Sequence, residues 1–148
     1  MEKRYLQLID EYREEMIKML QELIAIKSVA DDPVENAPFG RGVQDAFEYM
    51  LKKAADEGFD TENIDNYGGH IEFGGYTFDE EGKVIGTSEE IMGILVHLDV
   101  VPEGKDWDHD PYGGELIEDR IYGRGAIDDK GPTVAAFYAM KALKDAGI

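Results

Sequence analysis

The 148-residue sequence contains no cysteine, and this absence excludes two kinds of site at once. No disulfide framework can form, and no metal can be bound through thiolate sulfur. His, Asp and Glu are therefore the only strong metal ligands in the chain. Any metal site must use nitrogen and oxygen donors.

Basic residues are scarce, with 15 Lys and Arg against 33 Asp and Glu and a formal net charge of −18. A surface of this charge repels nucleic acids and anionic membranes, so neither is an expected partner. Long apolar runs are missing too. The longest, residues 134–140, is far too short for a membrane span. We therefore expect a cytoplasmic protein, and no pattern in the sequence indicates an oligomeric state.

Helical and strand-like patterns alternate along the chain. Amphipathic periodicity, helix-terminal glycines and Pro132 in a first turn predict helices over residues 3–27, 42–57 and 132–146. Period-two patterns bounded by glycine predict strands at 59–64 and 69–74 and hairpins within 75–86 and 115–123. This order predicts an α/β fold with a mixed β-sheet flanked by helices, of the size of one domain or a piece of one.

The stretch "IMGILVHLD", residues 91–99, is short and apolar, which predicts a strand buried on both faces in the middle of a sheet. Side chains two positions apart share one face of a strand, so His97 and Asp99 should point together at its carboxyl end. Ligand sites in open α/β sheets favour that edge. One nitrogen of His97 could bind a metal while a carboxylate orients the ring. Taken alone, however, such a pair is more often a solvated strand end.

Two adjacent carboxylates, Asp128 and Asp129, lie in the glycine-bounded turn "YGRGAIDDKGP" just before the last expected helix. Their simplest interpretation is an acidic N-cap region. A carboxylate can also bridge two divalent cations about 3.5 to 4 Å apart, as in hydrolases with two metals. This second acidic cluster favours the metal-site hypothesis for His97.

The stretch "HLDVVPEGKDWDHDPYGGELIEDRIYGRGAIDDKGP" resembles the metal-binding core of the di-zinc metallopeptidases related to carnosinase, carboxypeptidase G and aminoacylase, most of all the peptidase V dipeptidases. Three motifs occur in that family's order: H-x-D-V-x-P, W-x-x-x-P-[FY] and Y-G-R-G-x-x-D-D-K-G-P. The resemblance extends from the first helix to the last residue of the chain.

The resemblance implies that His97 is a ligand of one zinc ion and that Asp128 bridges the two Zn²⁺ ions of a complete active site. It makes Asp99 the catalytic residue that organises the site, and it implies a cis peptide bond between Asp128 and Asp129. The implied reaction is hydrolysis of a small peptide, a dipeptide, by a metal-activated water.

The resemblance also assigns roles to the neighbouring motif residues. It makes Trp107, Pro111 and Tyr112 packing residues that shape a loop. We expect Arg124 and Lys130 to pair with nearby carboxylates. His70 and His109 match no ligand position and are expected to be solvated.

One part of the family pattern has no counterpart here. The family's general base and next ligand come from a Glu-Glu pair after the D-D turn, whereas the Glu-Glu pairs of this chain all precede that turn. We therefore expect residues 1–148 to be the N-terminal part of a catalytic domain and inactive alone, with the rest of that domain and a lid domain outside this chain. Two alternatives stay open: a Mg²⁺-dependent phosphatase-like or phosphotransfer site with Asp99 or Asp128 as nucleophile, and a non-catalytic structural fragment.

Overall fold

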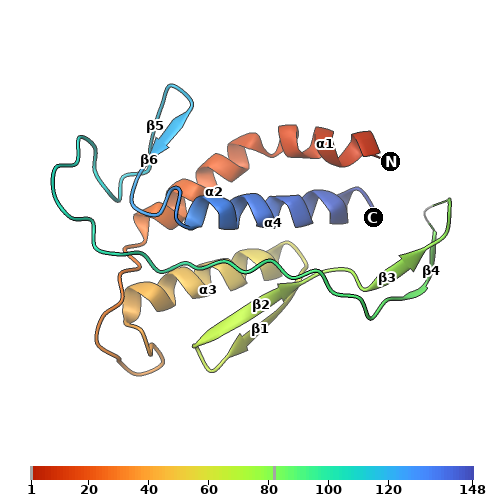
Figure 1. The fold of residues 1–148 in the computed structure, drawn as a ribbon, viewed down its shortest axis with the longest axis horizontal. Coiled ribbons are helices and arrows are strands. Elements are labelled where there is room, and N and C mark those ends of the chain that lie inside the picture. Colours follow the sequence, from red (N-terminus) through yellow and green to blue (C-terminus); the bar gives the residue numbers. More distant parts are fainter. Residues whose placement is uncertain (1, 82) are drawn as a thin grey trace.

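The computed structural model describes residues 2–81 and 83–148, and this part of the chain contains four helices (Figure 1). They are α1 (Glu2–Glu11), α2 (Arg13–Ala25), α3 (Arg41–Asp56) and α4 (Lys130–Asp145). The long helix expected over 3–27 is divided at Tyr12 into α1 and α2. Hydrogen bonds continue across this point, because the Tyr12 N–H donates to Leu8 and its carbonyl accepts from Met16, both at 2.9 Å. The other two expected helices are confirmed as α3 and α4.

The strands form three separate antiparallel hairpins. The pairs are β1 (Asp60–Ile64) with β2 (Gly68–Glu72), β3 (Tyr76–Phe78) with β4 (Val84–Thr87), and β5 (Glu115–Ile117) with β6 (Arg120–Tyr122). They match the predicted strands and hairpins, and the α/β class is confirmed. The mixed sheet differs from expectation: within the described residues, each strand belongs to a two-stranded sheet.

The buried strand expected over residues 91–99 is not formed. This segment has no regular secondary structure and crosses the molecule as an extended trace (Figure 1). Its side chains face solvent, with Ile91 89% and Leu95 98% exposed. Just beyond it, Val100 is buried and makes an isolated parallel bridge with Val29. The apolar pattern is typical of a strand that is buried on both faces. Within the described residues, Leu98 is the first residue of this segment that packs against the core.

The hydrophobic core lies where α2, α3 and α4 meet. Its buried members are Met19, Leu23, Met50, Ala54, Phe59, Val134, Phe137 and Tyr138. Full burial of a large apolar side chain contributes about 1.5 to 3 kcal/mol each, so this cluster fixes the C-terminal end of α2 relative to α4. The β1–β2 hairpin packs on α3, and α1 packs on α4. Among the described helices, none has the length and apolar character needed to cross a membrane.

Candidate functional site

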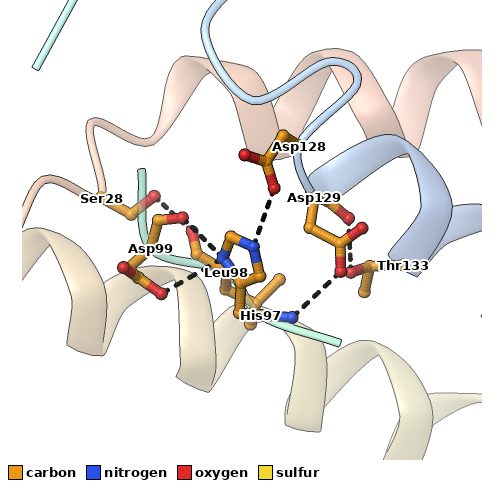
Figure 2. Close-up of polar contacts among 7 residues, drawn as sticks. All are labelled: Ser28, His97, Leu98, Asp99, Asp128, Asp129 and Thr133. Carbon is orange, nitrogen blue, oxygen red and sulfur yellow. Dashed lines mark hydrogen bonds and ion pairs between the residues drawn. The ribbon is translucent and has the colours of Figure 1, made fainter. Parts of the chain in front are cut away.

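His97 lies between two aspartates at the end of the extended segment (Figure 2). Its Nε2 is 2.9 Å from Oδ1 of Asp128. Its Nδ1 is 3.1 Å from the backbone carbonyl oxygen of Asp99 and 3.3 Å from the Asp99 Oδ1. The structure therefore brings together all three residues that the sequence singled out.

The two nitrogens of His97 have different partners. A carbonyl oxygen can only accept, so the contact with Asp99 favours a proton on Nδ1. Burial alone would lower the pKa of His97, but the hydrogen bonds with Asp128 and with the Asp99 carbonyl outweigh it and raise that pKa. The contact of Nε2 with Asp128 thus favours the positively charged form of the His97 ring more than solvent does.

Asp129 links the end of the extended segment, which carries His97, to the start of α4. Its Oδ2 accepts a hydrogen bond from the backbone N–H of His97 at 3.2 Å. Its carbonyl oxygen accepts from the Thr133 hydroxyl at 2.7 Å and from the Thr133 N–H at 3.0 Å, which joins it to the first turn of α4 (Figure 2). The Asp128–Asp129 peptide bond is cis, as the resemblance implied.

The alternative that Asp128 and Asp129 form only an acidic N-cap does not account for their side chains. Asp129 occupies the N-cap position of α4, but its side chain makes no capping hydrogen bond. Instead, Asp129 binds the backbone of His97 and Asp128 faces the His97 ring. Both carboxylates are therefore directed at the residue that the sequence predicted as a metal ligand.

Gly125 allows the turn before Asp128 to approach the end of the extended segment. Its φ is +87°, a conformation that glycine adopts without strain. A Cβ at this position would lie 2.8 Å from Cγ1 of Val100 and 3.1 Å from Cδ of Lys130. The close approach therefore requires a residue without a side chain.

Two buried polar residues near the site, Lys130 and Ser28, have roles that were not predicted from the sequence. Lys130 is 0% exposed, and its Nζ donates to the carbonyl oxygens of Leu23 and Ile26, both at 2.8 Å. The expectation that Lys130 pairs with a carboxylate is wrong. Its ammonium group binds the C-terminal end of α2, where the helix dipole favours a cation, and burial lowers its pKa to about 8.

Ser28 is the second such residue, and it is also 0% exposed. Its hydroxyl donates to the carbonyl of Leu98 at 2.6 Å, and its own carbonyl accepts from the Val100 N–H at 2.9 Å. These two bonds hold the backbone on both sides of Asp99. The surrounding stretch "LIAIKSV" carries no sequence signal for this role.

The loop that follows Val100 closes on Glu103. The backbone carbonyl of Glu103 accepts from Trp107 Nε1 at 2.6 Å and from Arg124 Nη2 at 3.1 Å, while its carboxylate accepts from Tyr112 at 2.8 Å and Lys27 at 3.0 Å. The Arg124 guanidinium also lies 5.4 Å from the Trp107 ring centre. Arg124 thus binds a carbonyl and a ring; within the described residues it makes no ion pair with a carboxylate, contrary to expectation.

The other two histidines lie in separate surroundings. His109 is partly buried rather than solvated, since its Nδ1 is 3.0 Å from the Glu115 carboxylate and its ring packs on Tyr122. His70 is half exposed on β2, with its Nε2 3.5 Å from Glu62 and 3.8 Å from Glu72.

The donors around His97 fit part of a zinc site. Zinc binds imidazole nitrogen and carboxylate oxygen, and the other ring nitrogen of a ligand histidine usually contacts a carbonyl or carboxylate, as Asp99 does here. Within residues 2–81 and 83–148, no group of three or more His, Cys, Asp and Glu side chains could hold a metal ion. Catalytic zinc sites usually have three protein ligands, so the described residues supply a portion of one.

Comparison with protein families and curated proteins supports the same relationship. Residues 93–148, which include the whole site, match the model of peptidase family M20/M25/M40. The chain is 45% identical over 135 residues to the Bacillus subtilis (strain 168) protein named "Putative dipeptidase YtjP". It is 40% identical over 142 residues to a Staphylococcus aureus (strain USA300) protein with the same description. These alignments cover 90% and 95% of this chain but only 27% and 28% of the two relatives.

Two solved structures share the fold. Human carnosine dipeptidase 1 matches with a TM-score of 0.69 and 23% identity, covering 99% of this chain and 32% of that one. The di-peptidase Dug1p from Saccharomyces cerevisiae matches with a TM-score of 0.68 and 21% identity, covering 98% and 31%. The chain thus has the fold of the N-terminal part of these larger proteins. The resemblance of its motifs to a peptidase family that includes dipeptidases is confirmed.

Proposed function

We propose that this relative of the M20 peptidases is the N-terminal part of a zinc-dependent dipeptidase that cleaves the peptide bond of small peptides. In this proposal His97 is a ligand of one zinc ion, Asp128 bridges two, and Asp99 orients the His97 ring. The observation that carries the proposal is the contact of His97 Nε2 with Asp128 at 2.9 Å, with Asp99 on the opposite nitrogen. The dipeptidase names of the bacterial relatives support the substrate class.

The residues of this chain would hold and orient the metal site. Asp99 would keep the proton of His97 on Nδ1, which leaves the Nε2 lone pair directed toward the ion. The Asp128 side chain is 86% exposed, so its carboxylate is accessible, as a bridging ligand must be. When bound, zinc polarises a carbonyl and makes water a stronger acid. The general base and the remaining ligands would come from outside residues 1–148.

The exposed segment 91–96 supports the proposal that the longer protein completes this domain. Its apolar side chains lie in solvent, and no strand of the described residues pairs with it. The chain spans only 27% to 28% of the curated relatives it matches. We propose that later parts of the protein cover this segment as an interior strand, and that a lid domain completes the substrate pocket.

A Mg²⁺-dependent phosphotransfer site is the weaker candidate. Magnesium prefers oxygen ligands, whereas the central group of this site is an imidazole. The matching family and relatives are peptidases, which also favours peptide hydrolysis. We propose the cytoplasm as the location of this acidic protein.

The test uses the full-length protein. We expect about two zinc ions per active site, hydrolysis of a dipeptide mixture, loss of activity with a chelator and recovery with Zn²⁺. The matched comparison adds Mg²⁺ instead of Zn²⁺ and offers a phosphate ester instead of a dipeptide. Dipeptide hydrolysis that persists without bound metal, or phosphate-ester cleavage with Mg²⁺ alone, would contradict the proposal.

A further inference from the structure

We infer that Ser28 and Lys130 are positioning residues that together set the distance between His97 and Asp128; this inference rests on the proposed function. The two halves of the site are far apart in sequence, and each is hydrogen-bonded to the same short stretch of backbone. We call this stretch, residues 23–28 at the end of α2 and just beyond it, the anchor segment.

The His97 half of the site is bound through Ser28. The Ser28 hydroxyl donates to the Leu98 carbonyl at 2.6 Å, and the Val100 N–H donates to the Ser28 carbonyl at 2.9 Å. Residues 91–96 on the other side of His97 are exposed and outside any strand. Within the described residues, the backbone of His97 is therefore fixed mainly by what holds Leu98 and Val100 and by its bond with Asp129.

The Asp128 half is bound through Lys130. Its buried ammonium group donates to the carbonyls of Leu23 and Ile26, which belong to the same anchor segment. Lys130 follows the Asp128–Asp129 pair directly and begins α4, so any shift of its backbone moves both carboxylates. A cation at the first position of a helix is disfavoured by the dipole of that helix. The two carbonyls at the end of α2 compensate for this placement.

Positioning must come from the backbone, because the site side chains are poorly packed. The His97 and Asp128 side chains are 48% and 86% exposed, so little surrounding packing limits their movement. Ser28 and Lys130, by contrast, are both fully buried. Gly125 allows the two halves to pack closely, since an added Cβ at this position would lie too close to both Val100 and Lys130. The anchor segment thus acts as a common reference for both ligands.

The test compares Ser28→Ala and Lys130→Met with wild type in the full-length protein. Zinc affinity is measured by competition with a chelator, and the absorption spectrum of bound Co²⁺ reports ligand geometry. We expect zinc affinity to fall about 10-fold or more in both variants, as for other losses of support around a metal site. We also expect a shifted Co²⁺ spectrum, and a lower kcat with little change in KM.

Leu8→Ala is the matched control, because Leu8 is buried on α1 but lies outside the core cluster that contains Leu23 of the anchor segment, so its truncation should make the protein less stable without disturbing that segment. It should lower the melting temperature and leave zinc affinity and the Co²⁺ spectrum unchanged. Should Lys130→Met not fold, the milder Ser28→Ala decides. Wild-type zinc affinity and spectrum in folded Ser28→Ala would overturn the inference while leaving the proposed function intact. A wild-type protein that binds no zinc would overturn the proposed function and, with it, this inference.

Discussion

The Nε2 of His97 and the Oδ1 of Asp128 lie 2.9 Å apart although 31 positions separate the two residues in the chain. A contact of this kind between exposed side chains contributes little to stability by itself, on the order of 0 to 1 kcal/mol. In the proposed function its main role is to bind metal rather than to stabilise the fold. This distinction allows the two roles to be separated by mutation.

Replacing His97 by Ala in the full-length protein should remove a metal ligand with little effect on folding. We expect zinc binding at one site to be lost and dipeptide hydrolysis to fall by at least 100-fold, since an outer-shell change alone costs 10 to 100-fold. The melting temperature of the metal-free protein should stay within about 2 °C, because a surface substitution usually costs less than about 0.5 kcal/mol. Unchanged zinc stoichiometry would contradict the assignment of His97.

Asp99→Asn should have a smaller effect of the same kind. The amide has nearly the shape of the carboxylate but holds the Nδ1 proton of His97 less strongly. We expect metal affinity or turnover to fall by about 10 to 100-fold, with the fold preserved. Circular dichroism and zinc stoichiometry on one preparation check this. Full activity in folded Asp99→Asn would contradict a role of Asp99 in the site.

Gly125→Ala should destabilise the protein through two effects. The φ of +87° is strained for alanine, and the new Cβ would lie 2.8 Å from Val100. Strain at a left-handed position costs on the order of 1 to 3 kcal/mol, to which the clash adds. Gly104→Ala is the control: its φ is +78°, but no atom lies within 4 Å of the added Cβ. Urea denaturation should show the larger loss of unfolding free energy for Gly125→Ala, and equal losses would exclude a packing role.

Glu103 should make the protein sensitive to acid. A hydrogen bond from its own backbone N–H, together with those from Lys27 and Tyr112, lowers the pKa of its carboxyl from 4.5 to about 2. A lowered pKa means that folding stabilises the ionised form of the Glu103 carboxyl group relative to its protonated form. The resulting stability is present above pH 4.5 and is lost as the pH falls toward about 2.

The measurement is the melting temperature of wild type and Glu103→Gln between pH 7 and about 2.5, a range chosen to span the lowered pKa. Wild type should be the more stable at neutral pH, and the difference should shrink on acidification because glutamine does not titrate. Parallel curves for the two proteins would show that the interactions of Glu103 contribute nothing pH-dependent.

Leu95→Glu tests whether later parts of the protein cover the exposed segment. Leu95 is 98% exposed, so in residues 1–148 alone the change should alter stability by no more than about 0.5 kcal/mol. In the full-length protein, a charge placed inside a sheet should cost several kcal/mol. Thermal unfolding of both proteins checks this, and equally small effects would contradict an interior strand.

The sequence correctly predicted the helices and hairpins whose packing partners lie within residues 1–148. The apolar periodicity of α2 and α3 predicted these helices correctly because their apolar faces are buried in one core, with Leu23 from α2 and Met50 from α3. The pattern at residues 91–96 predicted a buried strand, and neither the strand nor its burial is found, since both depend on neighbours that the described residues do not provide. Local pattern reports the preference of a segment, not the presence of its partners.

The site shows the same division. The three site residues were recognised because the motifs that contain them resemble those of a known metallopeptidase family. The contacts of Ser28 and Lys130 could not be predicted, because their partners are backbone carbonyls, which every residue has. Lys130 alone left a trace in the sequence, as a basic residue at the start of a helix, where the dipole disfavours it.

The hydrogen bond from Arg124 to the Glu103 carbonyl joins the two ends of the loop that separates the halves of the site. A loop closed at its base can grow at its tip at small entropic cost, about 0.6 kcal/mol for each doubling of length. Insertions near the exposed Gly104 would therefore change the loop between the two parts of the site without moving His97 relative to Asp128. New surface can be acquired in this loop by a change in its length alone.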